Sequence, residues 1–153
     1  MQEERRLQLN RILSALIDGL IILLIVWAAM AYPTVELIKE VQNGVISTGT
    51  ISFFIISFFA GMILGVLYLF VCYLLFKNAS FGMHFVHLTF IKYDGSKPKK
   101  MTLFYRSIFQ ILSFIFSLGF VVVANLISVL NNAHARNFQD YFFGIKMVNN
   151  DDL

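Results

Sequence analysis

The chain has 153 residues, of which 58% are hydrophobic and only 14% are charged, and its mean hydropathy is +0.74. Soluble domains average roughly 45–50% apolar and about 25% charged residues, so this composition excludes a soluble domain and indicates a membrane protein. A single cysteine, Cys72, excludes an internal disulfide framework. The formal net charge of +3 is better explained by basic cytoplasmic loops than by nucleic-acid binding, which we therefore do not expect.

Three apolar runs are long enough to cross a bilayer, since a helical crossing needs about 20 residues. They cover residues 12–32, 51–76 and 107–130. The sequence therefore predicts one all-α membrane domain over residues 1–153, a three-span helical bundle. The third run could instead be re-entrant and break near Gly119, but each half would then be only about 18 Å long, so a single crossing is the preferred interpretation.

The start of the chain has two interpretations. Basic residues, an apolar stretch and Ala29-Met30-Ala31 are similar to a secretory signal with its cleavage site, but the length of the stretch and Asp18 within it favour a retained helix. Most of the twelve lysines and arginines lie in the N-terminal segment and in the loop 77–106. This distribution predicts a multi-pass protein of the plasma membrane, with its N-terminus and this loop in the cytoplasm. Alternation over three crossings then places the tail from Asn131 on the opposite side.

Asp18 is the most informative single residue, because an unpaired acid within a membrane helix costs about 2.5–3.5 kcal/mol. Arg11 shares its helix face but leans toward the N-terminus, away from it. We therefore expect Arg106, at the mouth of the third apolar run, to be the partner of Asp18, with Gln110 and Asn125 as further polar groups. Asp18 then either binds a proton or cation, or forms a buried ion pair that only locks the helices together.

Small residues recur at every fourth position in the second apolar run. Ser57, Gly61 and Gly65 form a seam where another helix can approach closely. The seam serves packing within the chain or across a homo-oligomer, and a substrate path lined by glycine is a further alternative.

The segments around the third apolar run have the pattern of strands and turns. Residues 85–93 are aromatic and β-branched and lead into the turn dipeptide Asp94-Gly95, which predicts a short β-hairpin-like loop in the cytoplasm. In the tail, residues 144–148 have a strand pattern, and Asp140 before them suits a turn or a helix cap.

Two further features of the loop have modest interpretations. His84 and His87 have an H-x-x-H spacing, but no cysteine or acid nearby completes a ligand set, so we expect no metal site. Lys97, Lys99 and Lys100 either contact anionic lipid or simply hold the loop in the cytoplasm.

These motifs, in this order, resemble the RDD family of small bacterial and archaeal membrane proteins over almost the whole chain. The motifs that carry the resemblance are the R-x3-A-x2-D stripe from Arg11 to Asp18, Ser80-Phe81-Gly82, Asp94-Gly95, Arg106, Arg136, Gln139-Asp140 and residues 144–148. The chain departs from the family at Met83, where a lysine is common, and at Ile145, where a threonine is common.

The resemblance implies transport across the membrane, with exchange of sodium or another monovalent cation for protons suggested for some members. The family is named for an arginine and two aspartates. The resemblance makes Asp140 the second of these aspartates, and it makes Arg11, Asp18, Arg106 and Asp140 the candidate charge site. Three spans are few for a transport path, so we expect a homo-oligomer or a membrane partner. The two predicted strands are suited to pair, which requires that both lie on one side of the membrane.

The sequence contains no catalytic motif, so we expect neither an enzyme nor a cofactor. The preferred function is a transporter, or a transporter subunit, that exchanges a monovalent cation for protons at Asp18. The alternative is a non-enzymatic membrane accessory or immunity protein that binds a partner.

Overall fold

The structure is a computed structural model that describes residues 2–117, 119–131 and 136–149. The chain divides into two compact units, which are described separately. Unit 1 combines Met1–Asp18 with Leu69–Leu153, and unit 2 is Gly19–Tyr68.

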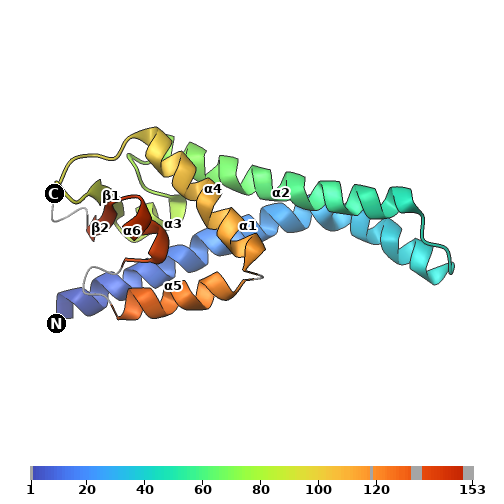
Figure 1. Ribbon diagram of the computed structural model, residues 1–153, viewed down its shortest axis with the longest axis horizontal. Helices are drawn as coiled ribbons and strands as arrows, with labels where there is room; N and C mark the ends of the chain where they lie inside the picture. Colours follow the sequence, from blue (N-terminus) through green and yellow to red (C-terminus); the bar gives the residue numbers. More distant parts are fainter. Residues whose placement is uncertain (1, 118, 132–135, 150–153) are drawn as a thin grey trace. The chain divides into compact units, whose positions relative to one another are not determined.

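The first two predicted spans are long helices, α1 (Gln2–Gln42) and α2 (Thr48–Leu75), shown in Figure 1. Each is long and apolar enough to cross a membrane, and most large apolar side chains along both are exposed, as expected for helices surrounded by lipid. Helix α1 begins well before the apolar run, because Glu3 and Glu4 in its first turn favour the positive end of the helix dipole. Arg11 lies buried within unit 1, so the N-terminal helix is part of the folded protein.

In unit 2 the small-residue seam of α2 packs against α1. A Cβ added at Gly61 would lie 3.0 Å from the Cα of Val26 and 3.3 Å from the Cβ of Ala29, so only glycine allows this approach without a shift. Ser57, one turn earlier, is also buried. Of the two packing alternatives, the one within the chain is therefore confirmed at Gly61, and the expected homo-oligomer stays a prediction.

The third apolar run is two helices in unit 1. Helix α4 (Lys100–Phe116) and helix α5 (Phe120–Leu130) are separated at Gly119, whose φ of 88° is left-handed. The preferred single continuous crossing is therefore wrong, and the alternative break near Gly119 is confirmed. With a rise of 1.5 Å per residue, these helices are roughly 25 and 16 Å long, too short to cross a hydrocarbon core of about 30 Å.

The turn at Gly119 gives a direct test of this break. Gly119→Ala should destabilise the protein by about 1–2 kcal/mol, because a Cβ strains a left-handed backbone. Thermal unfolding in detergent measures the loss. Gly119→Asn should lose less, because asparagine tolerates this conformation better, and equal losses for the two variants would contradict the argument.

A two-stranded sheet connects the loop with the tail. Strand β1 (Leu88–Lys92) pairs antiparallel with β2 (Ile145–Asn149), with Leu88 opposite Asn149 and Lys92 opposite Ile145. The pairing of these two segments is confirmed, whereas the hairpin within the loop is wrong. A turn does form at Asp94-Gly95, where Ser96 N–H donates to Asp94 Oδ1 at 2.8 Å, but the chain then continues into α4.

The strand also begins later than predicted. Of the expected residues 85–93, Phe85 is the last residue of the short helix α3 (Phe81–Phe85), which Ser80 caps through its side chain, and His87 takes a positive φ of 58° before β1 starts. The capped helical turn and the left-handed residue after it delay the start of the strand.

Pairing of β1 with β2 places the loop and the tail on the same side of the membrane. The expectation that the tail lies on the opposite side is therefore wrong. The count of three crossings is not confirmed, because two of the described helices are long and apolar enough to cross a membrane. Between the two strands, α4 enters and α5 returns, as Figure 1 shows, which is the course of a re-entrant hairpin. The Gln8 side chain donates to the carbonyl of Leu130 at 3.1 Å, so the end of α5 meets the start of α1.

Candidate functional site

Asp140 is held in place by its own short helix, α6 (Phe138–Phe142). Its backbone N–H donates to Asn137 Oδ1 at 2.9 Å, and its Oδ2 accepts the backbone N–H of Asn137 at 3.2 Å. This reciprocal capping box confirms the predicted capping role. The Asp140 side chain is nevertheless fully buried, so the cap also directs a carboxylate into the interior of unit 1.

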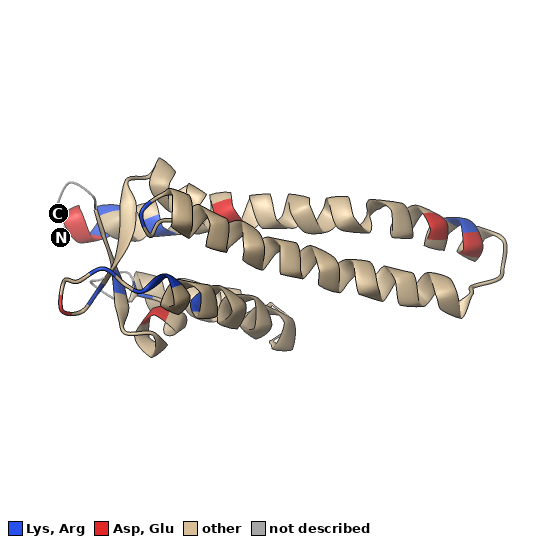
Figure 2. Cartoon of the chain, turned by 90° about the horizontal axis from the view of Figure 1, so that it is seen from above, with Lys and Arg blue, Asp and Glu red and all other residues tan. Residues whose placement is uncertain are grey.

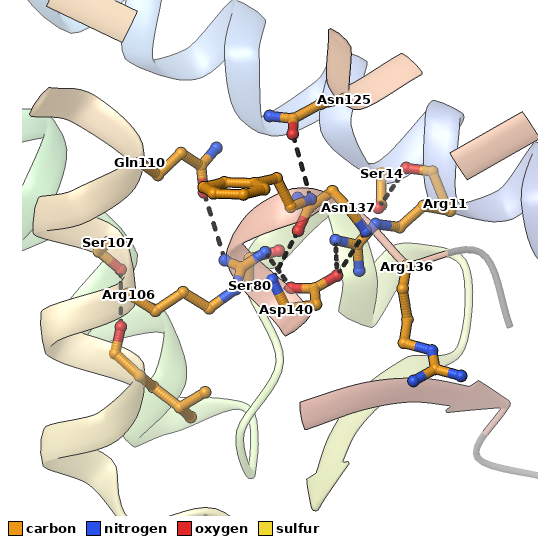
Figure 3. Close-up of polar contacts among 12 residues, drawn as sticks. Arg11, Ser14, Ser80, Arg106, Ser107, Gln110, Asn125, Arg136, Asn137 and Asp140 are labelled. Carbon is orange, nitrogen blue, oxygen red and sulfur yellow. Dashed lines mark hydrogen bonds and ion pairs between the residues drawn. The ribbon is translucent and has the colours of Figure 1, made fainter. Parts of the chain in front are cut away.

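Two buried arginines converge on this carboxylate (Figure 3). Arg106 donates through Nε at 2.9 Å and lies with Nη2 at 2.8 Å from Oδ1, while Arg11 donates through Nη2 to Oδ2. Both guanidinium groups are about 95% buried. Asp140 therefore joins α1, α4 and α6 through one carboxylate. Its Oδ1 faces two nitrogens of Arg106, and its Oδ2 accepts from Arg11 and from the Asn137 N–H.

The arginines are further held by aromatic and amide groups. The Cζ atoms of Arg106 and Arg11 lie 4.5 and 5.7 Å from the centroid of the Phe90 ring, so β1 supplies a cation–π surface under the pair. Arg106 Nη1 donates to Gln110 Oε1 at 3.2 Å and to the Tyr73 hydroxyl at 3.4 Å. These contacts distribute the positive charge over several partners in a buried site.

Asp18 occupies a different environment in the same unit. The Ser80 hydroxyl donates to its Oδ2, and the backbone N–H of Gly82 donates to its Oδ1 at 2.9 Å. Ser80 Oγ in turn accepts the backbone N–H of Met83 at 3.3 Å as the cap of α3. The Ser80-Phe-Gly82 motif is therefore the binding partner of Asp18, and α3 is held against α1 by this carboxylate.

Gly82 makes this contact possible because it has no side chain. A Cβ there would lie 2.3 Å from the carbonyl oxygen of Ser14 and 3.0 Å from Asp18 Oδ2. Ser14 is buried, and its hydroxyl donates to the Arg11 carbonyl at 2.8 Å. The face of α1 that carries Arg11, Ser14 and Asp18 is thus the face on which the rest of unit 1 assembles.

The structure brings three of the four predicted charged residues into one network. Arg11, Arg106 and Asp140 interact directly, whereas Asp18 lies half-buried against α3. The predicted partner of Asp18, Arg106, makes its ion pair with Asp140. Asn125, predicted as a further polar group, accepts the backbone N–H of Phe138 at 3.4 Å and thus connects α5 with α6.

Sequence reasoning missed the role of Phe90 and Tyr73. Phe90 is an ordinary strand residue in the pattern, and Tyr73 lies in an uncharged run, so neither position differs from a residue of an apolar core. Ser14 could have been found, because it lies one turn after Arg11 on the helix face that Asp18 shares.

The two aspartates differ in the donors that surround them. Arginine and backbone N–H groups can only donate, so every observed partner of the Asp140 carboxylate uses its oxygens as acceptors. A hydroxyl can donate or accept, so Ser80 can serve Asp18 with or without a proton on Oδ2, and the Gly82 bond to Oδ1 is kept in both cases. Asp18 therefore differs from Asp140 in having a hydroxyl among its partners, which can donate or accept.

Comparison with known proteins gives one match. The model of the RDD family matches residues 7–151, nearly the whole chain. No curated protein and no solved structure matches the chain.

Proposed function

Because the chain belongs to the RDD family, a family of membrane proteins, we propose that it is a transporter or transporter subunit that exchanges a monovalent cation for protons at Asp18. The observation that carries this proposal is the difference between the two aspartates. Asp140 is fully buried among groups that only donate, whereas Asp18 is half-buried and faces a hydroxyl that can reverse its hydrogen bond. An ionisable residue within an apolar helix is also the usual mark of an ion or proton path.

The surroundings of Asp18 suit a small cation as well as a proton. Oxygen atoms of three kinds gather beside Gly82: the Ser80 hydroxyl is hydrogen-bonded to Asp18 Oδ2, and the Ser14 carbonyl oxygen lies on the same side of Gly82 as this carboxylate. Carboxylate, carbonyl and hydroxyl oxygens are the ligands that hard cations prefer. A cation bound at Oδ2 would displace the hydrogen bond from Ser80, whose hydroxyl keeps its proton. When the cation leaves, Asp18 would take up a proton in its place, and the protonated Oδ2 could donate to Ser80 Oγ.

In this mechanism the arginine network positions the site and does not carry the ion. Arg11 and Asp18 lie on one face of α1, two turns apart, so the network at Asp140 fixes the rotation and depth of the helix that carries Asp18.

Reconstituted protein tests the exchange. Purified protein in liposomes that contain a pH-sensitive dye should show proton flux after a pulse of sodium, lithium or potassium. Asp18→Asn should lower this flux by at least tenfold, because an amide keeps the acceptor for the Gly82 N–H but cannot take up a proton. Asp94→Asn, in an exposed turn, is the matched control and should leave the flux unchanged.

The same experiment separates exchange from a partner-binding role. Well-folded protein that shows no cation-dependent flux would contradict the exchange proposal. An Asp18→Asn variant that keeps full flux would contradict the role of Asp18. A variant that loses abundance and thermal stability, with no flux in the parent protein, would favour the accessory or immunity role, in which Asp18 only holds α3 to α1.

A further inference from the structure

The start of α4 concentrates positive charge at an exposed end of unit 1. Lys97 and Lys99 are exposed in the loop that precedes the helix, and Figure 2 shows this loop with lysines along it and into the first turn of α4. Lys99 occupies the N-cap position with an extended backbone and supplies no side-chain hydrogen bond to the helix. The N–H groups of Thr102 and Leu103 donate to the Lys99 carbonyl at 2.9 and 3.4 Å, so the N–H groups of Lys100 and Met101 are the ones that point toward this basic end.

Lys100 shows that these charges are crowded. Its ammonium group donates to the Tyr73 carbonyl, and its pKa is lowered by burial and by the positive charge of Lys97. Lys97 lies three residues before Lys100 in the chain. The sequence between Ser96 and Phe116 contains no acidic side chain that would offset the repulsion between these two lysines. An anion bound at this end would relieve it.

The outward face of α4 next to these lysines is apolar. Met101 and Tyr105 lie one turn apart on one face, and each is 54% exposed. Leu112 and Phe116 extend the exposed apolar side chains toward the other end of the helix, while Leu103 is fully buried against the rest of unit 1. In a membrane protein such a face lies in lipid, so the lysines at its start lie at the level of the headgroups, where a tyrosine is also typical.

We propose that the start of α4 is a binding site for an anionic phospholipid. Lys97 and Lys99 contact the headgroup phosphate together with the N–H groups of Lys100 and Met101 at the start of α4. Met101 and Tyr105 lie against the acyl chains of the same lipid. The observations that favour a lipid over free phosphate are these two exposed apolar residues directly beside the basic end. The site is independent of ion exchange at Asp18.

Native mass spectrometry of the full chain in a neutral detergent tests this site. The protein is titrated with phosphatidylglycerol and, separately, with phosphatidylcholine of the same acyl chains. We expect phosphatidylglycerol to bind more tightly, and Lys97→Gln combined with Lys99→Gln to reduce this preference by about 25-fold, since each of the two lysines at a membrane surface contributes about fivefold. Both side chains are exposed, so the variant should unfold at the parent's temperature.

Two matched variants and one competitor make the result decisive. Lys39→Gln combined with Lys146→Gln removes the same charge elsewhere and should keep the preference, as should Lys97→Arg combined with Lys99→Arg. Inorganic phosphate at millimolar concentration should not displace the lipid. Equal binding of the two lipids, or a preference that survives in the Lys97/Lys99 glutamine variant, would overturn the proposal. Displacement by inorganic phosphate would assign the site to free phosphate and not to lipid.

Discussion

Asp140→Asn should lower the free energy of unfolding by about 3–5 kcal/mol, the typical cost of removing one partner from a buried ion pair. The amide keeps the shape of the side chain but leaves two buried guanidinium groups without a counter-charge. The thermal midpoint in detergent should fall by roughly 6–20 °C, and the abundance of the protein in the membrane should fall with it. Thermal unfolding of purified protein is the measurement.

Two further variants identify the cause of this loss. Asp94→Asn removes an acid at an exposed turn and should leave the thermal midpoint unchanged. Replacement of the whole network, with Arg11→Met, Arg106→Met and Asp140→Leu together, should be more stable than Asp140→Asn alone, because no charge is then left buried and unpaired. It should not fully recover, since the half of the capping box that the Asp140 side chain supplies to the Asn137 N–H is still lost. An Asp140→Asn protein as stable as the parent would contradict the central role of this carboxylate.

Gly82→Ala should destabilise the protein by about 2–3 kcal/mol. The added Cβ would lie 2.3 Å from the Ser14 carbonyl oxygen, which is backbone of α1 and cannot turn away. Helix α3 must therefore move from α1, and the hydrogen bonds from Gly82 and Ser80 to Asp18 lengthen or break. The measurement is the thermal midpoint, and cation-dependent proton flux should fall in the same variant if Asp18 carries the exchange.

Gly19→Ala is the matched control for this substitution. Gly19 lies next to Asp18 in α1, and a Cβ there meets nothing within 4 Å. Alanine favours a helix over glycine by up to about 1 kcal/mol, so this variant should be equally or slightly more stable than the parent. If both variants lose the same stability, the close approach of Gly82 to α1 is not the reason.

The sequence by itself determined the class of the protein and singled out Asp18, whereas the full set of four charged residues came from the resemblance to the RDD family. Apolar runs of about 20 residues can be satisfied only as helices within lipid, so α1 and α2 followed from composition and length. Asp18 stood out because an acid in such a run is costly, and the cap role of Asp140 followed from local chemistry that acts over three residues. Each of these inferences depends on interactions within one segment.

Only the tertiary structure decided how these segments combine. Length and hydropathy do not distinguish one crossing from two short helices, and the break was decided by the left-handed turn at Gly119. The pairing of β1 with β2 joins residues far apart in the chain and fixes the tail on the side of the loop. For the same reason the pairing of Arg106 with Asp140 could not be read from spacing, because α4 and α6 are placed against each other by the sheet and the re-entrant hairpin. Short sequence patterns determine local preferences, such as a helix within lipid or a helix cap. Which distant segments pair with each other depends on the surfaces that the whole fold buries together.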